Sequence, residues 1–103
     1  MARAIINGKL YDTKNAELVS WDSMHGPSSW HHWREELYLT AKGSWFLFGK
    51  GGPASKYAVR EGTGWGYGES IKPLRAPEAL DWLETAGDVD SIEEHFAAEI
   101  EEA

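Results

Sequence analysis

The chain has 103 residues, a net charge of −7, six tryptophans and no cysteine. This length is typical of one domain, and the absence of cysteine excludes disulfides, zinc–thiolate sites and thiol catalysis. The longest apolar run spans only four residues, 45–48, so we expect no membrane-spanning segment, and the opening MARAII does not resemble a secretion signal. We therefore expect a single cytoplasmic domain over residues 1–103.

The charge is unevenly distributed along the chain. Residues 1–76 carry ten Lys and Arg against seven Asp and Glu, whereas residues 77–103 carry ten acidic residues and no Lys or Arg. The acidic balance argues against general binding to duplex DNA, which requires a basic footprint. Two interpretations of the acidic segment stay open: a solvated helical tail, or an acidic surface that docks on a basic partner as nucleic-acid mimics do.

The first third of the chain predicts a β-hairpin. Residues 3–11 alternate loosely and include a β-branched pair, which indicates a strand, and residues 12–15 have turn chemistry because Asp and Asn side chains bond nearby backbone groups. Residues 16–22 then alternate again, so we expect them to return as the second strand.

A second hairpin is predicted between residues 34 and 48. Residues 34–40 alternate, 41–43 form a short connection with Gly43 suited to a positive φ, and 44–48 return. Because the returning strand is apolar on both faces, we expect it to be central in the sheet and covered on both sides.

The connection before this hairpin leaves two structures open. Residues 24–33 are irregular because Gly26 and Pro27 interrupt regular structure. Trp30, Trp33 and Leu37 nevertheless fit the i, i+3, i+7 spacing of a helix, so a helical turn over 29–35 is an alternative to an extended chain.

The last third predicts an edge strand followed by a helix. Residues 70–75 have strand character, and Pro73 favours the edge of the sheet because it cannot donate a ladder hydrogen bond. Pro77 suits the first turn of a helix, and Gly87 suits its C-terminal end.

A second helix is predicted from a capping pattern. Asp90 with Glu93 three residues later resembles a capping box. The apolar stripe of this helix is Ile92, Phe96 and Ile100. The expected fold is α+β: an antiparallel sheet of four to five strands built from hairpins (residues 1–75), with two C-terminal helices on one face (the acidic segment 76–103).

The segment 49–68 holds seven glycines together with Tyr57, Trp65 and Tyr67. Glycine-rich loops with aromatic residues allow close approach of another molecule, so this segment is the first candidate for a binding surface. Residues 49–54 match G-x-G-x-x-A, but no helical pattern follows the glycines, so we expect no dinucleotide site.

Catalytic and metal chemistry are not indicated. The potential metal ligands closest in sequence are Asp22, His25, His31 and His32. Adjacent histidines on an extended chain point in opposite directions, so this spacing is poor for one shared ion. Glu35 and Glu36 similarly divide between two strand faces, which disfavours a general acid–base pair. We therefore expect a protein that is not an enzyme, with no catalytic residue, cofactor or metal.

Single-stranded nucleic acid is an alternative partner. Aromatic side chains on a sheet beside Lys and Arg form a stacking platform for bases. The candidate residues are Tyr38, Trp45, Tyr57, Trp65 and Tyr67, with Lys50, Lys56 and Arg60. The acidic segment on the same domain would repel phosphates unless it faces away.

Four motifs form a recognisable pattern: Ile6-Asn7-Gly8-Lys9-x-Tyr11-Asp12-Thr13, Leu37-Tyr38-x-Thr40-x-x-Gly43, Phe46-Leu47-x-Gly49-x-Gly51-Gly52 and Ser55-x-Tyr57-Ala58. With residues 71–74 and Trp82, this pattern resembles a family of small, mostly uncharacterised bacterial proteins from phage-derived and other mobile regions. The resemblance covers about residues 5–85. It implies a context in which small acidic proteins resemble anti-defence factors, including anti-CRISPR and anti-restriction proteins, that bind and block a host complex.

The leading hypothesis is a non-enzymatic inhibitor that binds a host nuclease or effector complex. Two alternative interfaces are predicted. The first is the aromatic, glycine-rich surface of Lys50, Tyr57, Arg60, Trp65 and Tyr67. The second is the acidic helical surface of Glu93, Glu94, Glu99, Glu101 and Glu102. The sequence leaves the oligomeric state open.

Overall fold

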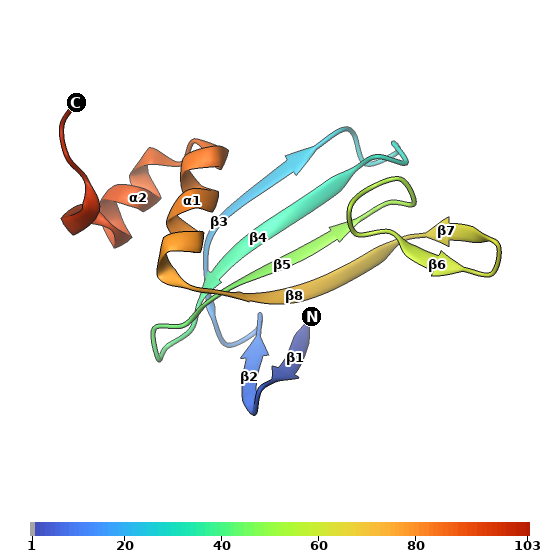
Figure 1. Cartoon of the computed structure of the whole chain (residues 1–103), viewed down its shortest axis with the longest axis horizontal. Helices are drawn as coiled ribbons and strands as arrows, with labels where there is room; N and C mark the ends of the chain where they lie inside the picture. The colour runs from blue at the N-terminus through green and yellow to red at the C-terminus, as the bar shows by residue number, and fades with distance from the viewer. Residues whose placement is uncertain (1) are drawn as a thin grey trace.

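The computed structural model describes residues 2–103. The strands are β1 (Arg3–Ile6), β2 (Lys9–Asp12), β3 (Glu17–Met24), β4 (Trp33–Leu39), β5 (Trp45–Gly51), β6 (Val59–Glu61), β7 (Gly64–Gly66) and β8 (Gly68–Leu74). The helices are α1 (Ala76–Ala86), α2 (Val89–His95) and the 3₁₀ turn η1 (Ala97–Glu99). The main sheet is antiparallel in the order β3-β4-β5-β8, with β1–β2 and β6–β7 as separate hairpins (Figure 1). The predicted α+β fold is confirmed.

The β4–β5 hairpin forms the centre of the sheet, as the returning strand that is apolar on both faces predicted. Leu37 lies opposite Leu47, and the connection turns at Gly43 with a φ of +85°. On one face of the sheet, α1 and α2 cover a buried cluster of Leu37, Trp45, Leu47, Ala79, Leu83 and Phe96. On the other face, the β1–β2 hairpin covers Tyr38 and Phe46 with Tyr11. Strand β5 is therefore central and covered on both sides.

The predicted first hairpin is wrong. Residues 3–11 are not one strand, because Asn7 and Gly8 take positive φ values of 52° and 77° and turn the chain back as β1–β2. An Asn-Gly pair at a two-residue turn is a strong hairpin signal. As a result, β3 pairs with β4 and not with the N-terminal strand. Residues 27–31 form turns before β4 begins at Trp33, so the helical alternative for 29–35 is also wrong.

The glycine-rich segment is more regular than a loop. Gly49 and Gly51 belong to β5, and residues 59–66 form the β6–β7 hairpin, which turns at Gly62 with a φ of +58°. Only residues 52–58 connect the sheet to this hairpin. Strand β8 lies at the edge of the sheet, as Pro73 indicated.

The helices follow the predicted order but with one different start. Pro77 lies in the first turn of α1, and Gly87 ends it with a φ of +75°. Helix α2 is capped by Asp88, whose carboxylate accepts a hydrogen bond from the Ser91 amide at 3.1 Å, and not by Asp90 as predicted. Because α2 ends at His95, the predicted stripe continues only as far as Phe96, and Ile100 lies beyond η1.

The molecule is flat, with extents of 49 × 35 × 18 Å. Its radius of gyration of 15.0 Å exceeds the roughly 13 Å typical of a compact domain of this length. The helices lie at one end of the long axis and the β6–β7 hairpin at the other (Figure 1). Within residues 2–103, no helix combines the length and apolar character needed to cross a membrane. Aromatic side chains at the end remote from the helices are thus left without a covering layer.

Candidate protein-binding surfaces

A buried carboxylate organises the sheet beside segment 52–58. Glu35 lies on the helix-facing side of β4 and is 5% exposed. Its Oε1 accepts a hydrogen bond from Trp82 Nε1 of α1 at 2.9 Å. Its Oε2 accepts a short hydrogen bond from the Tyr57 hydroxyl and pairs with Lys56 Nζ at 2.8 Å. One side chain therefore connects β4, α1 and the connection to β6.

The electrostatics of Glu35 follow from these three partners. Burial alone raises the pKa of this carboxyl, but the hydrogen bonds from Lys56, Tyr57 and Trp82 and the charge of Lys56 outweigh burial and hold the pKa below its usual value. Burial and the same carboxylate raise the pKa of the Tyr57 hydroxyl. Both Glu35 oxygens are occupied by donors, so this carboxylate is suited to fixing structure and not to transferring protons.

Glycines explain how segment 52–58 lies so close to the sheet. A Cβ at Gly49 would lie 1.9 Å from the Tyr57 ring, and a Cβ at Gly51 would lie 2.2 Å from Ser55 Oγ. Gly52 approaches the Trp30 carbonyl, which also accepts a hydrogen bond from the Ala54 amide at 2.8 Å. The glycines thus permit close internal packing, which holds the segment between the loop of residues 25–32 and the β6–β7 hairpin.

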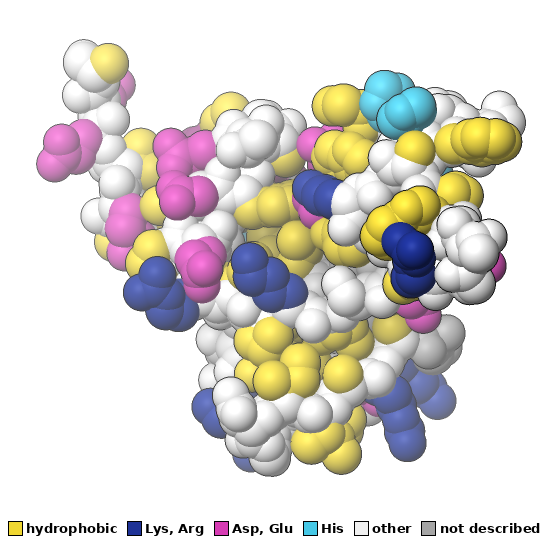
Figure 2. All heavy atoms as spheres, turned by 45° about the vertical axis from the view of Figure 1, so that its right-hand side comes forward, with side chains coloured by type: hydrophobic (Ala, Val, Ile, Leu, Met, Phe, Trp, Pro, Cys, Tyr) yellow, Lys and Arg dark blue, Asp and Glu magenta, His cyan; other side chains and the backbone are white. Residues whose placement is uncertain are grey.

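Four large apolar side chains are exposed at this end of the molecule, and two of them, Trp30 and Trp65, lie beside segment 52–58. We call them the loop-end surface, and they are Met24, Trp30, Trp65 and Tyr67, with exposed fractions of 51%, 74%, 57% and 54%. Figure 2, which turns this end forward, shows yellow hydrophobic side chains beside histidine and cationic groups. Arg60 lies over the Trp65 ring at 5.4 Å. Exposed tryptophan and tyrosine on a fixed backbone are typical anchors of protein interfaces.

The sheet face opposite the helices carries a further exposed tryptophan. Trp21 on β3 is 53% exposed, and the Arg34 guanidinium lies 4.3 Å from its ring centre. Arg34 also bonds Glu36 at 2.8 Å, and Glu36 accepts from the Tyr38 hydroxyl. Burial and this carboxylate raise the pKa of Tyr38 to about 12. Opposite charges therefore alternate along this face, which makes it less suited to phosphates than a purely basic surface.

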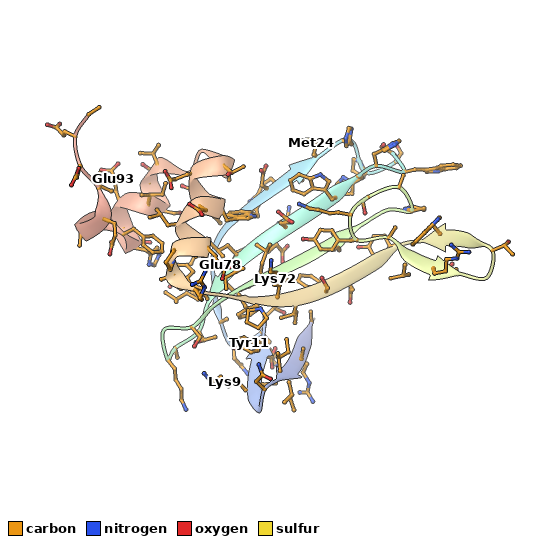
Figure 3. All side chains as sticks on the ribbon, viewed as in Figure 1. Lys9, Tyr11, Met24, Lys72, Glu78 and Glu93 are labelled. Atoms are coloured by element: carbon orange, nitrogen blue, oxygen red, sulfur yellow. The ribbon has the colours of Figure 1, made fainter. Side chains whose placement is uncertain are left out.

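A cleft of about 450 Å³ separates α1 from segment 52–58. Its lining includes Trp33, Lys72, Glu78 and Asp81, with Glu35 among the buried groups. Lys72 and Glu78 lie near one another at this cleft (Figure 3). The backbone hydrogen bond from Arg75 is the main cause of the lowered pKa of Glu78, and the charges of Arg75 and Lys72 add to it. The mixed charges of this cleft do not single out a ligand.

The structure divides the predicted aromatic site. Arg60, Trp65 and Tyr67 are exposed at the loop end, but Tyr57 is half-buried with its ring over Gly49. Lys50 lies on the opposite sheet face with Glu36 and Glu69. Trp30 and Met24 belong to the surface but were not proposed. Their exposure follows from the turns at residues 25–32, and no periodic pattern in the sequence predicts it.

The structure also removes part of the predicted base-stacking platform. Tyr38 and Trp45 are each 8% exposed and belong to the two cores. With Tyr57 turned inward, only Trp65 and Tyr67 of the five proposed aromatics are open to solvent. The prediction of a stacking platform was wrong for both residues, because the helices cover Trp45 of β5 on one face and the β1–β2 hairpin covers Tyr38 of β4 on the other.

The predicted acidic residues are all exposed at the helical end. Glu93 and Glu94 lie on α2, Glu99 on η1, and Glu101 and Glu102 on the final segment. Glu94 lies 2.9 Å from His95 Nε2. Glu93, Glu99 and Glu101 surround one groove, together with Glu84 of α1.

The histidines are arranged for local structure. His32 Nδ1 lies 2.9 Å from the His25 carbonyl, and the His25 and His31 rings are 5.7 Å apart. Among residues 2–103, one group has metal-ligand spacing, Glu17, Glu94 and His95, within 4.8 Å of one another. Two of these three are exposed, and exposed acidic groups often meet without an ion.

Comparison of the chain with protein-family models, curated proteins and solved structures gives no match.

Proposed function

We propose that this protein is a non-enzymatic protein-binding factor that acts by occupying a functional surface of its target. The observation that carries the proposal is the loop-end surface, where Met24, Trp30, Trp65 and Tyr67 are each more than half exposed. Scattered surface hydrophobics need no explanation, but three large aromatic side chains exposed at the same end of the molecule favour an interface.

Rigidity of the underlying backbone supports this function. Glu35, Tyr57 and Trp82 fix segment 52–58, and this segment lies between Trp30 and Trp65. Aromatic anchors that are already positioned lose little conformational freedom on binding. The loop-end surface is therefore suited to recognising a folded protein without rearrangement.

For the target, we propose a host defence nuclease or effector complex met by a mobile genetic element. This part of the proposal depends on the resemblance of the motifs at residues 6–58 to proteins of phage-derived regions. A small, flat domain can inhibit such a complex simply by covering the surface that the complex needs. The mode of action requires no catalytic group.

The test is affinity capture from lysate of a bacterium that carries an active defence system. The bait is the tagged full chain, and the comparison is the Trp30→Ser/Trp65→Ser variant, whose fold is checked by circular dichroism. We expect a defence protein to co-purify with the native chain and to be depleted with the variant, because both anchors are lost. Expression of the native chain should also raise phage plating efficiency in that host.

Single-stranded nucleic acid is a distinct outcome of the same test. An oligonucleotide that quenches tryptophan fluorescence at low salt, and loses this effect in the Trp30→Ser/Trp65→Ser variant, would favour base stacking over protein binding. Capture of the same proteins by both baits would show that the loop-end surface is not the interface.

A further inference from the structure

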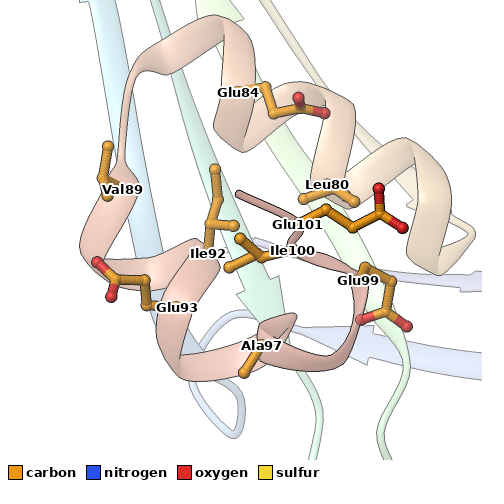
Figure 4. A pocket seen from close by; sticks show the side chains of 9 residues that line it. All are labelled: Leu80, Glu84, Val89, Ile92, Glu93, Ala97, Glu99, Ile100 and Glu101. Carbon is orange, nitrogen blue, oxygen red and sulfur yellow. The ribbon is translucent and has the colours of Figure 1, made fainter. Parts of the chain in front are cut away.

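An apolar groove lies at the helical end of the molecule, remote from the loop-end surface. Its volume is about 650 Å³, and its apolar lining comes from α1, α2, η1 and the final segment (Figure 4). The apolar members are Leu80, Val89, Ile92, Ala97 and Ile100. Val89 and Ile100 are 61% and 46% exposed, so a partner that enters the groove can contact apolar side chains.

The groove is surrounded by acidic side chains. Glu84, Glu93, Glu99 and Glu101 line it, and its lining contains no Lys or Arg. Residues 77–103 have a formal charge of −10 with His95 neutral, and no Lys or Arg follows Arg75 in the chain. The groove therefore combines an apolar floor with a strongly negative surrounding.

Local structure explains why the groove stays open. Ile92 packs from α2 toward the buried cluster beneath the helices, and the chain then leaves the helix at Phe96. The 3₁₀ turn η1 redirects the chain so that Ile100 lies beside Ile92 and Leu80 (Figure 4). The early end of α2 thus makes one wall of the groove from the segment after η1.

We propose that this groove binds a basic amphipathic segment of a partner protein. The apolar side of such a segment would contact Val89, Ile92 and Ile100, and its Lys or Arg side chains would face the surrounding glutamates. Apolar grooves commonly accept amphipathic segments through side chains spaced along one face. Complementary charge selects a basic segment over an acidic one and accelerates its association.

This inference goes beyond the proposed function because it assigns a second interface with its own partner chemistry. The loop-end surface presents tryptophan and tyrosine with one arginine, whereas the groove presents aliphatic and acidic side chains. Substitutions at Trp30 and Trp65 leave the groove intact. The two interfaces can therefore fail independently.

The test is titration of the full chain with a synthetic amphipathic peptide of about 18 residues. The peptide carries Leu on one helical face and Lys on the other, and a peptide with Glu in place of Lys is the control. Affinity is measured by fluorescence anisotropy, and amide chemical shifts locate the site. We expect the Lys peptide to bind, to shift amides of residues 89–101, and to weaken as salt is raised.

Matched variants separate groove binding from general attraction between opposite charges. Glu93→Gln/Glu99→Gln removes two charges from the groove, and Glu94→Gln/Glu102→Gln removes two charges outside it. We expect the first pair to weaken binding by about threefold or more and the second pair to have a smaller effect. Ile100→Ala should weaken binding by up to about tenfold without unfolding the chain, because Ile100 is partly exposed.

Three results would overturn the inference. One is an equal loss from the two glutamate pairs, and another is binding that is insensitive to Ile100→Ala. The third is a dimer that dissociates in the Ile100→Ala variant, since a second copy of the chain would then cover the groove. Each of these results leaves the capture experiment with Trp30 and Trp65 unaffected.

Discussion

At the scale of single residues, Glu35 is the side chain on which the loop end depends. The carboxylate has three donors from two other parts of the chain, so removing it leaves Lys56, Tyr57 and Trp82 without their acceptor. Loss of a charged acceptor costs more than the bond contributed where the donors stay partly buried, as for Tyr57 and Trp82, whereas Lys56 is 55% exposed and can turn to water.

We predict that Glu35→Gln lowers the free energy of unfolding by about 2 kcal/mol at pH 7. The pKa of Glu35 is lower in the folded chain than in the unfolded chain. As the pH falls toward the unfolded-state pKa, the unfolded chain therefore takes up a proton at Glu35 before the folded chain does. The stabilisation is thus present at neutral pH and is lost in acid. Urea unfolding of the native chain and of Glu35→Gln, from pH 7 to about pH 3, should show that the difference between their free energies of unfolding becomes smaller. The control is Glu69→Gln at an exposed position of β8; a difference independent of pH would contradict the assigned role.

Gly49 provides a second test at this scale. We predict that Gly49→Ala costs about 1–3 kcal/mol, because its Cβ would occupy the place of the Tyr57 ring. Gly26→Ala is the matched control, since its Cβ meets no atom within 4 Å. In a Tyr57→Ala background the cost of Gly49→Ala should fall, which urea unfolding of the four proteins measures. If Gly49→Ala costs the same stability in the Tyr57→Ala background, the Tyr57 ring is not the reason that position 49 requires glycine.

At the scale of elements, the cap of α2 joins the helical end to the sheet. Asp88 accepts hydrogen bonds from the Ser91 amide at 3.1 Å and from the Ser91 hydroxyl at 2.8 Å. It also accepts from the Ser20 hydroxyl of β3 at 2.5 Å. These bonds, led by the one from Ser20, lower the pKa of Asp88. One carboxylate therefore starts the helix and anchors it.

We predict that Asp88→Ala destabilises the fold by about 1–2 kcal/mol and that Asp90→Ala has an effect of only a few tenths. Each substitution removes one negative charge, and the two sites are two residues apart, so both variants have the same net charge. Urea unfolding midpoints compare them directly. A larger effect from Asp90→Ala would contradict the Asp88 cap and favour Asp90, the position that the sequence pattern predicted.

The elements also show what a sequence reveals and what it does not. The β4–β5 hairpin, the edge position of β8 and the ends of α1 were predictable, because alternation, Pro73 and Gly87 act locally. The Asn7–Gly8 turn is local as well, because an Asn-Gly pair is a strong hairpin signal. Asp88 also accepts a hydrogen bond from Ser20, which is 68 residues away, so this part of the cap lies outside any local pattern.

The candidate site was less predictable than the fold. Tyr57 and Trp65 share the same glycine-rich segment, yet one is turned inward toward Glu35 and the other is exposed. Gly49 lets the Tyr57 ring lie on the sheet, and the Tyr57 hydroxyl then reaches Glu35, which is 22 residues away in the sequence and on another strand. Exposure of Trp30 likewise depends on its loop packing against Gly52.

At the scale of the whole molecule, the flat shape separates two surfaces of different chemistry. The aromatic loop end lies beyond the uncovered part of the sheet, and the acidic groove lies among the helices at the other end of the long axis (Figure 1). Such an arrangement is suited to a protein that contacts its target along an extended line. We expect salt to weaken contacts at the acidic end much more than contacts at the aromatic end, because only the former depend on net charge.

The most direct test of the central claim is quantitative affinity capture with three baits: the native chain, Trp30→Ser/Trp65→Ser and Glu94→Gln/Glu102→Gln. The account predicts that a host defence protein is recovered with the native chain and with the glutamate variant but is depleted with the tryptophan variant. Equal recovery of that protein with all three baits would contradict the claim that the loop-end surface is the interface.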